Sequence, residues 1–358
     1  MNNNNRNLSF DLLRCIAMIM IVVWHYYIHG IEYSIFPKEP ISLFNYVISQ
    51  YIIILCSVCV NTYILISGFF LITKDFKTNR FINIWFQAMV YNVIIIFLLN
   101  CFRNHNLAVK DILNAFFPIR NKAYWFINCY LGLIIISPFL AKAASSLSKR
   151  SYDYLMIMIL ILGTKCLWNY PLGDVLDFNN GYSFVWFICL FLTGGYIRRF
   201  DLRWKYLSLK TFFLLAGLIC IIKCALTLHH HTITLTYPSY NSYPFILSFI
   251  LLYSFKRLYF QRSKIALFIQ FIVPMTFGVY LIHDHKLIRS LIWGSTSLWI
   301  NDTNSYTFLP KMICISIIIY ILCTIIEYIR IKTFHILGID IIIKNLCKKL
   351  DSIIIIKI

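Results

Sequence analysis

Besides His29 at its end, three residues with acidic or basic side chains interrupt the first long apolar segment of the chain, FDLLRCIAMIMIVVWHYYIHG, which runs from Phe10 to Gly30. They are Asp11, Arg14 and His25. A helix turns about 100° and rises about 1.5 Å per residue, so Arg14 and His25 share one face and lie roughly 16 Å apart along the axis. Asp11 lies one turn before Arg14, within reach of an ion pair. The three residues therefore form one polar stripe along an otherwise apolar helix.

The shared stripe predicts a functional polar path, and the geometry alone does not say which chemistry it serves. Histidine titrates near neutral pH, so His25 can act as a general base. Arg14 is a permanent cation that can orient a donor or stabilise negative charge, and Asp11 can hold it in position. Simpler explanations stay open. Arg14 can extend to the cytoplasmic head groups, Asp11 can serve as a charge at the helix N-terminus, and His25 can lie at the membrane interface.

The composition is that of a polytopic membrane protein. Of 358 residues, 60% are hydrophobic and 13% are charged, and the mean hydropathy is +0.73. The net charge of +19 is spread between apolar segments, which argues against a nucleic-acid-binding domain and in favour of anchoring at cytoplasmic loops. The 12 cysteines fall mostly inside apolar segments, and Cys56 and Cys59 form an isolated CxxC, so we expect no metal.

The hydrophobic pattern predicts an all-α bundle of about ten transmembrane helices. The expected spans are 10–29, 46–72, 82–102, 124–141, 153–168, 183–197, 211–228, 243–259, 266–285 and 308–329. The fifth, sixth and eighth of these are short. No cleavage site of the A-x-A type follows the first segment, which we expect to be a retained span.

The distribution of Lys and Arg predicts the orientation. With a cytoplasmic N-terminus, the inner segments carry 22 of these residues and the outer segments carry 8, so both termini are expected inside. We expect residues 1–330 to form the membrane domain and 331–358 to form a basic, apolar cytoplasmic tail. That tail either lies along the inner membrane surface or extends into solvent.

Five segments, taken in order, resemble a known family. They are Asp11-Leu12-Leu13-Arg14 followed by His25, then ISGFFL from Ile66, YWFINCYLGLIIISP from Tyr124, FICLFLTGGYIR from Phe187, and FGVYLIHD from Phe277. In this order they resemble the acyltransferase-3 family of membrane acyltransferases, from about Asp11 to Ile329. One departure concerns the loop after the second helix. Family members often carry two basic residues and a proline there, whereas TNRFINIWF has Arg80 alone.

The resemblance implies an enzyme of the plasma (inner) membrane, with about ten helices. Such enzymes move an acyl group, usually acetyl, from cytoplasmic acyl-CoA to a sugar hydroxyl of a surface or lipid-linked polysaccharide. We therefore expect acetyl-CoA as the donor, a glycan as the acceptor and the lipid bilayer as the surroundings. Nucleic acid is not an expected partner.

Roles for individual residues follow from this expectation. His25, Arg14 and Asp11 are the expected catalytic group, in which His25 takes the proton of the sugar hydroxyl or carries the acyl group transiently. A pantetheine arm entering from the inside would reach from Arg14 to His25. Arg80 is expected to meet the acyl-CoA phosphates, and Ser67 with Gly68 to let helix backbones approach closely near the donor path. Trp125 and Tyr130 are candidates for stacking on the acceptor sugar, and His283 for lining the acceptor entrance. Their alternative roles are interfacial or core packing.

Two other functions remain open at this point. A glycan flippase or exporter also needs polar residues inside a helix bundle, but it needs neither a histidine nor an acyl-CoA site. A non-catalytic membrane partner of a glycan-assembly complex would tolerate replacement of His25 and Arg14.

Overall fold

The computed structural model describes residues 7–31, 41–103, 113, 115–117, 124–165, 178–229, 235–259, 264–297 and 303–353. This part of the chain consists of helices joined by turns and contains no strand. The all-α prediction is therefore confirmed.

The helices follow the apolar segments of the sequence, and several begin at side-chain caps. Asn7, Ser42, Ser148 and Ser183 each accept a hydrogen bond from a backbone N–H of the first turn. The α-helices are α1 (Leu8–His25), α3 (Leu43–Cys56), α4 (Cys59–Leu71), α5 (Thr78–Arg103), α7 (Trp125–Ser146), α8 (Lys149–Gly163), α10 (Phe184–Arg199), α11 (Leu209–His229), α12 (Tyr243–Arg257), α13 (Lys264–Ile272), α14 (Thr276–His283), α15 (Lys286–Ser297), α16 (Phe308–Ile336) and α17 (Ile339–Ile353). A π-helix, η2 (Tyr26–Ile31), continues α1, and short 3₁₀ turns occupy η3 (Asn179–Gly181) and η4 (Val273–Met275).

Within the described residues, seven helical segments are long and apolar enough to cross a membrane. They are Leu8–Gly30, Leu43–Leu71, Thr78–Phe102, Trp125–Ser146, Leu209–His229, Lys264–His283 and Phe308–Ile336. Each overlaps one of the ten predicted spans. The other three predictions correspond to α8, α10 and α12, which have 15, 16 and 15 residues. These are shorter than the roughly 20 residues that a crossing needs, so the total of ten and the orientation remain predictions.

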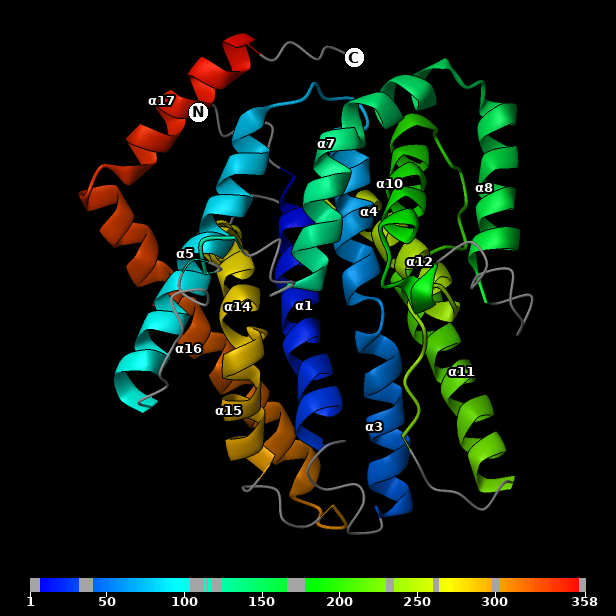
Figure 1. Cartoon of the computed structure of the whole chain (residues 1–358). Helices are drawn as coiled ribbons and strands as arrows, with labels where there is room; N and C mark the ends of the chain where they lie inside the picture. Colours follow the sequence, from blue (N-terminus) through cyan, green and yellow to red (C-terminus); the bar gives the residue numbers. More distant parts are fainter. Residues whose placement is uncertain are drawn as a thin grey trace.

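Helix α1 stands in the middle of the bundle, between α14 and α4 (Figure 1). Its buried residues include Asp11 and His25, and its other neighbours include α12, α13 and α16. A helix surrounded in this way exposes little of its surface to lipid. Ionisable side chains are tolerated in a membrane protein when they face the bundle interior. The central position of α1 therefore explains how it keeps its polar stripe.

Helices α4 and α10 approach each other backbone to backbone. A methyl group on Gly68 would overlap the carbonyl of Phe191, and one on Gly194 would overlap the carbonyl of Leu65. Glycine permits such contact because it has no Cβ. The predicted close approach at Gly68 is confirmed, and it fixes α4 against α10 on one side of α1.

The last helix, α17, lies outside the bundle. In Figure 1 it occupies the end of the bundle at which α1 begins and α16 ends. Asp351 accepts hydrogen bonds from the backbone N–H and the hydroxyl of Thr78, at 2.9 and 2.8 Å, and so ties α17 to the start of α5. The predicted boundary at residue 330 falls inside α16, which continues to Ile336; residues 354–358 of the expected tail lie outside the described part.

Candidate active site

The polar stripe on α1 faces the protein interior. Arg14 Nη1 donates to Asp11 Oδ1 at 2.8 Å, so the predicted pair forms within one turn of helix. Asp11 and His25 are 3% and 8% exposed. The Arg14 guanidinium also lies over the ring of Phe70, 5.4 Å from its centroid.

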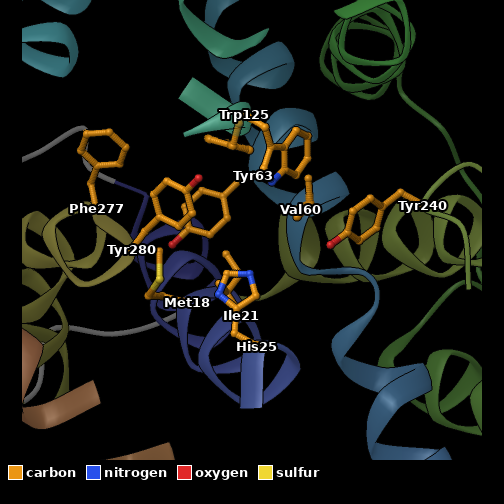
Figure 2. A pocket seen from close by; sticks show the side chains of 10 residues that line it. Met18, Ile21, His25, Val60, Tyr63, Trp125, Tyr240, Phe277 and Tyr280 are labelled. Atoms are coloured by element: carbon orange, nitrogen blue, oxygen red, sulfur yellow. The ribbon is translucent and has the colours of Figure 1, made fainter. Parts of the chain in front are cut away.

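A pocket runs along this face of α1. Its cavity volume is about 40 Å³, and Met18, Ile21 and His25 supply the α1 wall. Aromatic side chains form most of the remaining lining: Tyr63 from α4, Trp125 and Phe126 from α7, Tyr240, and Phe277 and Tyr280 from α14. Figure 2 shows the His25 ring at one end of the group, with Met18 and Ile21 beside it. The pocket is therefore mainly apolar, with one imidazole at its wall.

Tyr63 connects this pocket to the backbone of Arg14. Tyr63, which lines it, donates its hydroxyl to the backbone carbonyl of Arg14 at 2.8 Å. Met18 lies one turn beyond Arg14 on the way to His25. Arg14 itself does not line the pocket, so a ligand that meets both Arg14 and His25 has to extend beyond it.

Two of the remaining predicted residues meet beside this path. The hydroxyl of Ser67 lies 2.9 Å from that of Tyr130, and it also donates to the carbonyl of Tyr63 at 3.0 Å. Ser67 was assigned to the donor and Tyr130 to the acceptor, yet the structure brings them together. Since Tyr63 also bonds to Arg14, both belong to the Arg14 end of the site.

Basic side chains gather at this end. Arg80 donates to the carbonyl of Asp75 at 2.9 Å. Arg198 lies over the ring of Phe69, 5.2 Å from its centroid, while Arg14 covers the adjacent Phe70. Arg80 is predicted from the sequence as a phosphate contact, whereas Arg198 stands there only as the end of the FICLFLTGGYIR segment.

Trp125 belongs to an aromatic group at the pocket wall. Its ring centroid lies 4.7 Å from that of Tyr182 and 6.4 Å from that of Tyr240, with which it is stacked. Tyr182 and Tyr240 are themselves 4.8 Å apart. Flat aromatic faces of this kind can hold a sugar ring or pack among themselves, and both explanations offered for Trp125 remain compatible with its position.

His283 differs from the prediction in its surroundings. It is fully buried and is not among the residues that line the pocket. It contacts His25 instead, with 2.9 Å between His25 Nδ1 and His283 Nε2. His283 therefore has no open path to the acceptor in this structure, although the sequence predicted it at the acceptor entrance.

Two further residues complete the surroundings of His25: Asp284, which ends the FGVYLIHD segment, and Arg289, which belongs to none of the five segments. Asp284 Oδ1 lies 3.5 Å from His25 Nδ1, and Arg289 donates to the same oxygen at 2.7 Å. The only signal in the sequence is that Asp284 follows His283 directly and Arg289 comes five residues later. Nothing in that spacing shows that they meet the first helix.

One group of side chains has the composition of a metal site. The ligand atoms of His25, His29 and Asp284 all lie within 4.8 Å of one another. Two histidines and a carboxylate suit Zn²⁺. However, Asp284 already binds Arg289, and His25 Nδ1 faces His283. We therefore interpret the group as a hydrogen-bonded cluster.

A buried histidine lines a pocket inside a bundle that, among the described residues, has seven helices long and apolar enough to cross a membrane. A family model described as an acyltransferase domain matches residues 7–328. The chain therefore belongs to the acyltransferase-3 family, as its motifs predicted, and is a membrane acyltransferase. Comparison with curated proteins and with solved structures finds no match.

Proposed function

We propose that this acyltransferase moves an acetyl or other short acyl group from acyl-CoA to a hydroxyl group of a surface or lipid-linked polysaccharide, in the plasma membrane. The observation that supports this most directly is the mainly apolar pocket along Met18 and Ile21 that has His25 in its wall, joined to Arg14 through Tyr63. It offers an apolar path to an acyl chain or pantetheine arm and a base at one end of it. Acetyl-CoA is the donor we favour.

The donor enters from the Arg14 end in this proposal. Arg14, Arg80 and Arg198 supply positive charge there, which suits the phosphates of coenzyme A. Asp11 holds the Arg14 guanidinium through the 2.8 Å contact. The thioester then lies deeper in the pocket, along Met18 and Ile21.

The acceptor hydroxyl meets the thioester beside His25. As its oxygen attacks the carbonyl carbon, His25 takes the hydroxyl proton. The new C–O bond replaces the C–S bond, and the coenzyme A thiolate takes the proton from His25. The products are an ester and a free thiol, and the histidine returns to its neutral form.

The acceptor side is proposed to include Trp125 with Tyr182 and Tyr240. Aromatic faces stack well on the apolar faces of sugar rings. Tyr130 is assigned to the donor side instead, because its hydroxyl contacts Ser67. This division leaves His25 between the two substrates.

The test uses inverted membrane vesicles from cells that lack the gene, resupplied with the wild-type protein or with His25→Ala. Labelled acetyl-CoA is added outside, and label is measured in the extracted glycan fraction. We expect label with the wild type and at least about a 100-fold lower rate with His25→Ala, the usual minimum for losing a general base. Equal labelling by both proteins, at equal expression, contradicts the proposal.

A further inference from the structure

His25 contacts a second buried histidine that lies 258 residues later in the sequence. His283, the last residue of α14, directs Nε2 at His25 Nδ1 across 2.9 Å. Its other ring nitrogen, Nδ1, lies 2.6 Å from the backbone carbonyl of Val279 in the same helix. Both nitrogens of His283 are therefore engaged within the protein.

These two contacts determine where the protons are. A carbonyl oxygen only accepts, so His283 must donate to Val279 from Nδ1–H. A neutral imidazole carries one N–H, which leaves a lone pair on His283 Nε2. His25 must then donate to this lone pair from its own Nδ1. In the neutral ring of His25 the free lone pair is consequently on Nε2.

The lone pair on Nε2 is the one a substrate can use. The His25 ring lines the pocket, whereas His283 is fully buried behind it. Since Nδ1 is engaged by His283, Nε2 is the nitrogen left for the acceptor hydroxyl. The opposite tautomer would present an N–H, which cannot accept a proton.

The carboxylate of Asp284 also lies beside Nδ1 of His25. Asp284 Oδ1 lies 3.5 Å from His25 Nδ1 and is itself held by Arg289 at 2.7 Å. Asp284 is 1% exposed, so its carboxylate acts at short range without water between. When His25 gains a proton, Asp284 is close enough to stabilise the positive charge.

We propose that His283 and Asp284 are positioning residues, which set the tautomer of His25 and stabilise its protonated form during acyl transfer. This inference rests on the proposed function. His283 keeps Nε2 of His25 unprotonated before the reaction. Asp284, held by Arg289, stabilises the imidazolium between removal of the hydroxyl proton and its transfer to the coenzyme A thiolate.

The tautomer is tested by nitrogen NMR on the wild-type protein labelled with ¹⁵N-histidine in lipid nanodiscs. The His25 signals are assigned by their loss in His25→Gln. We expect Nδ1 protonated and Nε2 unprotonated. A His25 ring protonated on Nε2 overturns the inference, whatever the enzyme acylates, because this measurement needs no substrate.

Kinetics test the consequence. His283→Leu removes the acceptor for His25 Nδ1–H, and we expect kcat to fall about 100-fold while KM for acetyl-CoA changes less than about 3-fold. His283→Gln offers a side-chain oxygen in its place and should restore at least a tenth of the wild-type kcat. His285→Gln is the control, because His285 is also buried but bonds to Asn92 instead.

The outcomes separate this inference from the proposed function. If the wild type transfers acetyl and His25→Ala does not, but His283→Leu matches the wild type, the function stands and the positioning role is wrong. If the wild type transfers no acetyl, the proposed function fails, and the NMR result still decides the tautomer. If His283→Leu does not fold, His283→Gln and the wild-type NMR measurement remain decisive.

Discussion

Gly278 of α14 lies directly against the carboxylate of Glu327 on α16, so closely that a methyl group on Gly278 would overlap it. Glu327 is fully buried and cannot move freely, because Arg330 donates to both of its oxygens, at 2.8 and 2.6 Å. Tyr91 of α5 adds a hydrogen bond of 2.5 Å. This contact sets the position of α14, the helix that ends in His283.

Gly278→Ala should therefore lower both stability and activity. Filling a closely packed site typically costs about 1–3 kcal/mol, and the shift of α14 would disturb the contact between His283 and His25. Thermal unfolding in detergent measures the first effect, and acetyl transfer measures the second. Gly217→Ala on α11 is the control, because no atom lies within 4 Å of a methyl group there. Equal behaviour of the two variants would contradict the role of this contact.

Glu327→Gln tests the charge in the same cluster. It keeps the shape of the side chain but leaves the Arg330 guanidinium without its anionic partner. Breaking a buried ion pair typically costs about 3–5 kcal/mol; Arg330 is partly exposed here, so we expect about 1–3 kcal/mol. The loss is read as the change in free energy of unfolding, with Tyr91→Phe for comparison. A variant as stable as the wild type would show that the pair adds nothing.

Replacement by alanine should have a small effect at Ser67 and a severe effect at Gly68. Ser67→Ala loses its hydroxyl contacts, which is worth about 1 kcal/mol, and acetyl transfer should stay within about 3-fold of the wild type. Gly68→Ala would collide with the backbone of Phe191 and should abolish stable folding. Size-exclusion profiles and transfer rates measure both. A complete loss of transfer in well-folded Ser67→Ala would instead make Ser67 a nucleophile.

The tail helix α17 is expected to lie on the membrane surface. Ile342, Leu346 and Ile353 are 66%, 49% and 76% exposed and lie on one side, whereas Lys344 and Lys348 lie on another. Ile342→Asp should then speed tryptic cleavage at the tail lysines in intact inverted vesicles several-fold. Ser352→Asp, on the polar side, is the control and should leave the cleavage rate unchanged. Equal rates in both variants would indicate a solvated tail.

The sequence alone predicted the features that depend on local geometry. The stripe of Asp11, Arg14 and His25 follows from the period of the helix, and the ion pair between Asp11 and Arg14 spans only one turn. The close contact at Gly68 follows from the absence of a side chain. The all-helical fold follows from long apolar segments that must satisfy their own backbone hydrogen bonds in lipid.

Features that depend on tertiary packing could not be predicted in the same way. His283 meets His25 across 258 positions of sequence, and Arg289 arrives through the turn between α14 and α15. Tyr130 is on an aromatic helix face and looks like a sugar platform, yet its hydroxyl contacts Ser67. The hydrophobic pattern also could not predict the π-helix after His25, because its residues are as apolar as those of an α-helix.

The central claim is that His25 performs acyl transfer to surface glycans. Its most direct test is the O-acetyl content of the cell's surface polysaccharides, measured by NMR in the wild type, in a His25→Ala strain with verified expression, and in a deletion strain. We predict that the acetyl signals disappear in both mutants and return with the wild-type gene. Identical acetyl signals in all three strains would contradict the claim and make transport of a glycan the leading explanation.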